Sequence, residues 1–160
     1  MWGLKHTRRI ARFAVAAMIG ALGLSGCADS LTSANERGGE RIRAQRAIWD
    51  SLQLDDYTFE TRRVCFCGFV GWLEVTVAGD TVQQVVALEA EDAPQSALSD
   101  YPTVDELFDI LEEAVAQDAA QIEVTWHETM GYPESFFIDY SRNIADEELG
   151  HDIRLLSPAP

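Results

Sequence analysis

Polar and apolar positions follow regular spacings along most of the chain after its first 40 residues. Over 104–117, apolar residues recur every three or four positions, and Thr103 and Glu106 supply the T-x-x-E pattern of a capping box at the start. This spacing predicts an amphipathic helix there. A weaker pattern with the same period predicts another helix over 40–54.

Six further segments have the alternation typical of strands. They are 57–67, 72–78, 81–88, 121–127, 136–140 and 150–156. Short turns join several consecutive segments, which favours antiparallel pairing. The order helix, three strands, helix, three strands predicts an α+β fold, with an antiparallel sheet of about five or six strands packed against two helices. About 120 residues are enough for one core, so we expect a single domain over 40–158.

The first 26 residues have the composition of an export signal. Residues 1–12 carry four basic side chains and no acid, and residues 13–24 are an unbroken run of apolar or small residues. That order is typical of a secretory signal peptide, and the run is shorter than the about 20 apolar residues of a membrane-spanning helix. Thr7-Arg8-Arg9 leaves a twin-arginine export route open beside the general secretory route.

The sequence Leu24-Ser25-Gly26-Cys27 closes this segment and resembles the lipobox of bacterial lipoproteins. The resemblance implies cleavage before Cys27, acyl chains on Cys27 that hold the protein to the lipid bilayer, and a position in the cell envelope facing the periplasm or the exterior. Several chains anchor a protein stably because each buried methylene contributes about 0.8 kcal/mol. The alternative is an ordinary secretory signal with an incidental cysteine. Residues 28–39 are small and polar, so we expect residues 27–39 to be a lipidated cysteine followed by a flexible tether.

Charge narrows the classes of partner. Removal of residues 1–26 leaves eight basic and 27 acidic residues, a formal net charge of −19. Such a domain does not bind nucleic acid through phosphate contacts, which require clustered Lys and Arg. It also lacks a polybasic patch for anionic lipid. We therefore expect a domain that stands off the bilayer, with another envelope protein as the candidate partner.

Cys65 and Cys67 are the sharpest candidates for chemistry in the domain. Outside the cytoplasm a cysteine pair is usually oxidised. Two positions apart on a strand, the Cα atoms lie about 6.6 Å apart, at the limit for a disulfide, so a bridge requires a local bulge. We favour a structural disulfide. Two buried thiols, a redox pair, and a metal site shared with His127 and His151 remain open, although these histidines have opposite strand parities.

An acidic segment near the end of the chain is a weak candidate for Ca²⁺. Its oxygen-bearing side chains are those of Asp139, Asn143, Asp146, Glu147 and Glu148. Calcium takes six to eight oxygen ligands, but the spacing and central glycine of an EF-hand are absent here. We therefore favour an acidic surface loop.

The sequence contains few residues or motifs that are typical of an enzyme active site. Only two histidines remain after the signal, and no nucleophile elbow, zinc-protease motif or glycine-rich phosphate loop is present. The large aromatic residues are expected in the core: Trp49, Trp72, Trp126, Phe136 and Tyr140. We expect no cofactor and a non-enzymatic binding or interaction domain. The alternatives are a module for Ca²⁺ or a small ligand, and a thiol redox protein.

Several short motifs follow one another in a distinctive order. They are Trp49 with Asp-Tyr-Thr-Phe at 56–59, Cys-Phe-Cys at 65–67, Thr-Val-Asp-Glu-Leu-Phe at 103–108, Gly-Tyr-Pro at 131–133, Ile-Asp at 138–139 and Asp-Glu-Glu at 146–148. This set resembles the bacterial domain-of-unknown-function family 6174, whose members are mostly exported or lipid-anchored, over about residues 45–156. Members often have Tyr-Asp where this chain has Trp126-His127. The resemblance implies the fold and export, and it implies no activity.

Overall fold

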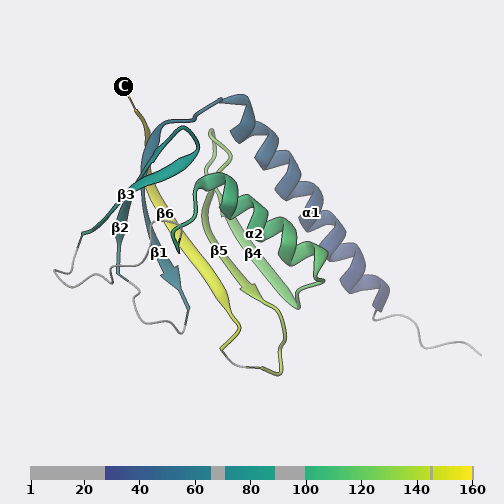
Figure 1. Cartoon of the computed structure of the whole chain (residues 1–160). Coiled ribbons are helices and arrows are strands. Elements are labelled where there is room, and N and C mark those ends of the chain that lie inside the picture. Colours follow the sequence, from purple (N-terminus) through teal and green to yellow (C-terminus); the bar gives the residue numbers. More distant parts are fainter. Residues whose placement is uncertain (1–27, 66–70, 89–99, 145, 160) are drawn as a thin grey trace, which may run out of the picture.

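The computed structural model describes residues 28–65, 71–88, 100–144 and 146–159, with side chains from residue 35 onward. Two helices and six strands form one α+β unit (Figure 1), as the sequence pattern predicts. In chain order they are α1 (Ala28–Ser51), β1 (Tyr57–Val64), β2 (Leu73–Ala78), β3 (Thr81–Ala87), α2 (Val104–Ala116), β4 (Gln121–Trp126), β5 (Pro133–Asp139) and β6 (Leu149–Pro158).

All six strands form one antiparallel sheet in the order β3-β2-β1-β6-β5-β4. Each half of the chain therefore contributes a three-stranded meander, and the pairing of β1 with β6 joins the two meanders. Both helices lie on the same side of this sheet (Figure 1). One face of the sheet is thus covered by helices, and we call the other the open face.

The core lies between the sheet and α2. Five side chains of α2 are buried: Val104, Leu107, Phe108, Leu111 and Ala114. The predicted capping box is confirmed, since Thr103 Oγ1 accepts from the Glu106 amide at 3.2 Å and the Thr103 amide donates to the Glu106 carboxylate at 2.7 Å. The Tyr57 hydroxyl of β1 also accepts from the Val104 amide, at 3.0 Å. The start of α2 is therefore fixed both locally and by the sheet.

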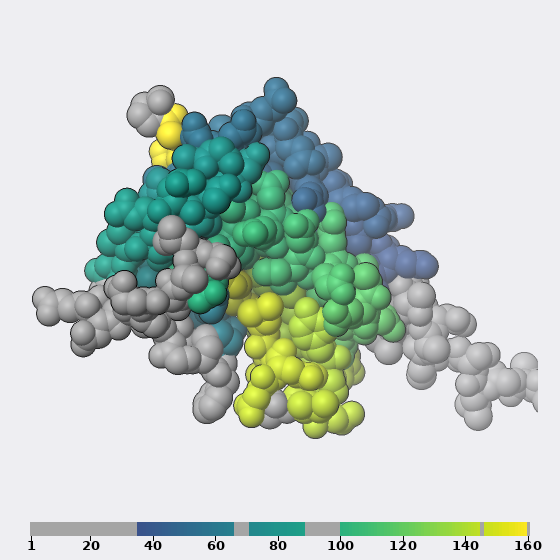
Figure 2. Space-filling model, in the orientation of Figure 1, coloured from purple at the N-terminus to yellow at the C-terminus, as the bar shows by residue number. Residues whose placement is uncertain are grey.

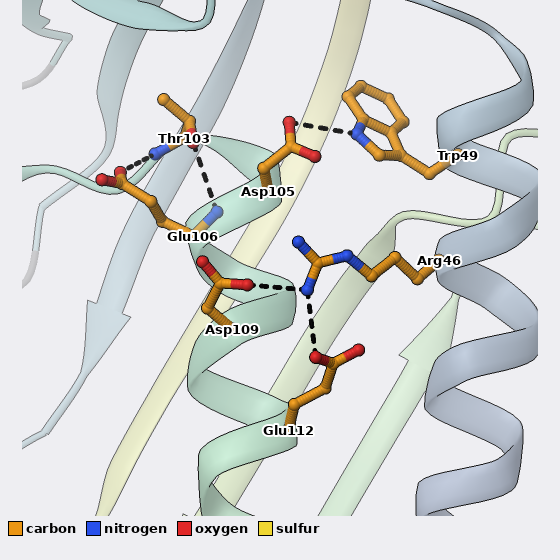
Figure 3. A network of polar contacts seen from close by, with 7 residues as sticks. All are labelled: Arg46, Trp49, Thr103, Asp105, Glu106, Asp109 and Glu112. Atoms are coloured by element: carbon orange, nitrogen blue, oxygen red, sulfur yellow. Dashed lines mark hydrogen bonds and ion pairs between the residues drawn. The ribbon is translucent and has the colours of Figure 1, made fainter.

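Polar contacts attach α1 to α2 (Figure 3). Arg46 donates to Asp109 at 2.6 Å and to Glu112 at 3.2 Å, and the Trp49 indole donates to Asp105 at 3.3 Å. Partial burial acts to lower the pKa of Arg46, but the two carboxylates, led by Asp109, raise it overall. The pKa of Asp105 is raised by burial. These contacts fix the C-terminal half of α1 on the helical layer.

The prediction of a flexible coil over 28–39 is wrong, because α1 already begins at Ala28. Glycines disfavour a helix by about 1 kcal/mol each, but tertiary contacts override this preference. The Asn35 amide donates to Asp118 at 2.6 Å. Gly39 packs so closely on α2 that a Cβ there would lie 3.1 Å from Val115 Cγ1. A side chain at Gly39 would therefore require Val115 to shift by a few tenths of an ångström at this helix contact.

Candidate functional site

Of the three cysteines, Cys65 lies within the described residues. Cys65 directly follows β1, is half-buried and has an interaction partner in the structure. Cys27 and Cys67 lie outside the described residues. Lipidation at Cys27 and a disulfide between Cys65 and Cys67 therefore stay predictions.

The two histidines serve separate structural roles. His151 is 3% exposed, lies 3.4 Å from Thr61 Oγ1 through Nδ1, and packs against the Phe136 ring. Burial lowers the pKa of His151 to about 4, and the nearby Arg63 acts in the same direction. Thr61 and His151 have the residue types of a nucleophile and a base, but both are sealed in the core and out of reach of a substrate.

His127 lies just after β4, where its Nδ1 accepts from the Met130 amide at 3.1 Å and its ring stacks on Tyr132. These contacts hold the turn between β4 and β5. Among the described residues, no three His, Cys, Asp or Glu side chains are placed to hold a metal ion. A metal site that joins both histidines therefore has no support in the geometry.

The acidic segment between β5 and β6 behaves as a loop. Asp139 accepts from the Ser141 amide at 2.9 Å, a local turn contact, and Asp146 has a φ of 85°. Within the described residues, the carboxylates of Asp139, Asp146, Glu147 and Glu148 form no group of three that could hold a metal ion. The calcium hypothesis gains no support from this arrangement.

Most of the predicted core aromatics are indeed packed against the core. Trp49 is 3% exposed and meets the Tyr57 ring edge-on at 5.4 Å, and Trp126 stacks on Phe108 at 5.8 Å. Tyr140 is half-buried against the same cluster, and Phe136 is buried within it. They serve packing, as expected.

Trp72 is the exception, because its ring lies against charged side chains and not in the core. The guanidinium of Arg154 lies 3.8 Å from the ring centroid, and that of Arg62 lies 5.0 Å from it. A Trp face attracts such cations through its quadrupole. Trp72 is half-buried against these two groups and is not part of the core cluster, so the prediction that it packs in the core is wrong.

Two cross-strand ion pairs hold these arginines. Arg154 of β6 contacts Glu60 of β1 at 2.6 Å, and Arg62 of β1 contacts Asp152 of β6 at 2.7 Å. Both pairs follow the register in which Glu60 faces Arg154 and Arg62 faces Asp152. We call this group of five side chains, Glu60, Arg62, Trp72, Asp152 and Arg154, the Trp72 platform.

A β-bulge lies beside the Trp72 platform. Where β1 has only Phe59 between Thr58 and Glu60, β6 has both Leu155 and Leu156. Leu155 takes the extra position with a φ of 53° and is 70% exposed. An exposed leucine in the left-handed region is uncommon, so the bulge presents an apolar side chain next to Arg154.

The Trp72 platform has the chemistry of a contact surface. Its charges are already compensated, and none of its side chains is a nucleophile with a neighbouring base. Trp and Arg are the residue types that contribute most to protein interfaces. Sequence analysis did not find this site, because the pairing of β1 with β6 cannot be read from alternation alone.

The fold and this surface define a small α+β sheet domain with one open face. The chain belongs to DUF6174, a family of unknown function whose model matches residues 41–158. This confirms the family resemblance, and the match begins within α1. The chain matches no curated protein and no solved structure. No helix in the described residues is both long and apolar enough to cross a membrane.

Proposed function

We propose that this protein is a lipid-anchored envelope protein whose domain binds another protein through the Trp72 platform and catalyses no reaction itself. The observation that carries this proposal is the contact of the Trp72 ring with the guanidinium groups of Arg62 and Arg154 on the open face. The basic signal, its short apolar core and the Leu-Ser-Gly-Cys sequence support the anchor.

Preorganisation favours binding at this surface. Each arginine of the Trp72 platform is tied to a carboxylate on the neighbouring strand, so it loses little freedom when a partner arrives. Ordering a flexible side chain at an interface costs about 0.5–1.5 kcal/mol, and a prepaired side chain avoids part of that cost. Leu155 adds an exposed apolar contact beside the charged group.

The helix α1 limits how far the domain can move from the proposed anchor at Cys27. Because α1 begins at Ala28, directly after the proposed lipidation site, the connection to the bilayer is shorter than a coil of 12 residues would make it. The orientation of the domain relative to the membrane is then restricted. A restricted orientation favours a partner in or near the same membrane.

Photo-crosslinking in intact cells tests the partner. A photoreactive amino acid replaces Thr76, on the open face, or Ala116, on the exposed side of α2 as the matched control. We expect a specific crosslinked protein from position 76 only, and its loss when Trp72→Ala is added. Equal crosslinking from both positions, or a product unchanged by Trp72→Ala, would reject the Trp72 platform as the contact.

Cell fractionation with an alkyne fatty acid tests the anchor separately. The wild type should carry the label and sediment with membranes. The Cys27→Ala variant should lose the label and leave the membrane fraction. A variant that stays unlabelled and membrane-bound would place the attachment elsewhere in the molecule.

A further inference from the structure

A second surface, away from the Trp72 platform, lies where α1 passes the outer edge of the sheet. Strand β4 is the last strand on that side, and the N-terminal end of α1 points away from the sheet (Figure 1). Because the helix diverges from the strand there, a groove of about 360 Å³ opens between them. In Figure 2, where the colours begin at residue 35, α1 forms the upper right edge of the molecule.

The groove has an apolar floor. Ile122, Val124 and Trp126 of β4 line it together with Ile42 of α1 and Val115 of α2. Asn35 also lines it, and its side-chain amide donates to Asp118. Gly38 forms part of the wall, and a Cβ there would have no neighbour within 4 Å. Gly38 therefore leaves room beside it for a larger side chain.

Charge distinguishes the groove from the rest of this acidic protein. None of its lining residues is acidic, and Arg41 is the cation among them. Within the described part of the chain, the three arginines without a hydrogen-bonding or ion-pair partner all lie on α1: Arg37, Arg41 and Arg43. The other described arginines are held by carboxylates or backbone carbonyls. Arg41 is thus an uncompensated donor at the edge of an apolar groove.

We propose that this groove binds the hydrocarbon chain of a medium-length fatty acid, whose carboxylate is held by Arg41. Small-molecule sites are mostly apolar, with a few polar groups that fix orientation, and occupy about 300–1,000 Å³. The groove lies at the small end of that range, which favours a single short chain over a complete phospholipid. A guanidinium and a carboxylate make strong charge-assisted hydrogen bonds. This site is independent of the Trp72 platform and of acylation at Cys27.

Fluorescence titration with a dansyl-labelled undecanoic acid tests the site, with decanoate and decanol as competitors. The full chain carries Cys27→Ser in every sample, so no attached acyl chain can occupy the groove and any binding to the signal segment is common to all variants. We expect saturable binding that decanoate displaces about tenfold better than decanol, because only decanoate engages Arg41. Equal displacement by the two competitors would overturn the role of Arg41.

Gly38 provides a matched pair of variants. Gly38→Leu places a side chain in the groove and should weaken probe binding at least about tenfold, whereas Gly38→Ala should leave it within about twofold. Both replacements favour the helix over glycine, so neither should lower the unfolding midpoint. Arg41→Gln should remove the preference for decanoate over decanol. Trp72→Ala should bind the probe like the wild type. Unchanged affinity in Gly38→Leu, or no saturable binding in the wild type, would overturn the proposal.

Discussion

Strand β1 separates two kinds of surface within eight residues. Tyr57, Phe59 and Thr61 point toward the helices and are 0%, 1% and 2% exposed. Glu60 and Arg62 point the other way and make ion pairs with β6. The covered face gains its stability from buried area, which contributes about 25 cal/mol per Å². Exposed ion pairs contribute only about 0–1 kcal/mol each. The open face can therefore change with little effect on the fold, which leaves it available for binding.

The largest effect should come from the centre of the covered face. Phe108 is fully buried and stacks on Trp126. We expect Phe108→Ala to lower the free energy of unfolding by about 4 kcal/mol, because it removes buried area and leaves a cavity. Urea unfolding followed by circular dichroism measures this. A loss below about 1 kcal/mol would contradict the division between the two faces.

The next effect is a pH dependence from the same face. His151 titrates near 4 in the folded state, below its ordinary value of 6.5, because burial and Arg63 disfavour the charged form and only Asp152 favours it. Between pH 6.5 and pH 4, His151 therefore binds a proton in the unfolded chain but not in the folded one. The free energy of unfolding consequently falls as the pH is lowered from about 6.5 to 4. The loss is on the order of 3 kcal/mol.

Urea unfolding at several pH values isolates this contribution. Carboxylates also titrate near pH 4, so the informative quantity is the difference between the wild type and His151→Gln. That variant should lose the part of the slope between pH 6.5 and 4.5. A His151→Gln profile parallel to the wild type would refute the assignment.

A smaller effect is expected at the start of α2. Thr103→Ala removes the acceptor for the Glu106 amide and should destabilise the domain by about 1 kcal/mol. Thr103→Ser retains the hydroxyl and should restore most of this stability. Thermal unfolding of the three proteins gives the comparison. Equal midpoints for the Ala and Ser variants would mean that the hydroxyl is not what stabilises the helix end.

The capping box is also where prediction from sequence worked best. Thr103 and Glu106 are three positions apart, and the spacing of the apolar residues after them is visible in one short window. The predicted helix over 104–117 corresponds to α2 at Val104–Ala116. The six strands were also predicted, because alternation is a property of neighbouring residues. Local patterns therefore gave the fold class and the order of the elements.

The features that could not be predicted from the sequence depend on contacts between segments that are far apart in the chain. Asn35 bonds to a residue 83 positions away, and this kind of contact holds a glycine-containing segment in α1. The Trp72 platform depends on Arg154 meeting Glu60, 94 positions away. No window of sequence contains both members of such a pair. The same limit applies to the groove beside Arg41, which is formed by α1, α2 and β4 together.

The smallest effect on stability should be found on the open face, at the pair of Glu60 and Arg154. A double-mutant cycle with Glu60→Gln and Arg154→Met should give a coupling energy of about 0.2–1 kcal/mol, because water screens a pair in which Arg154 is half-exposed. Urea unfolding measures the cycle, and raising the salt concentration should reduce the coupling. A coupling above about 2 kcal/mol would show that the open face stabilises the fold as much as the covered one does. The same variants release Arg154 from its carboxylate or remove it from the Trp72 ring. If the platform is a contact surface, they should therefore reduce crosslinking from position 76 far more than they reduce stability.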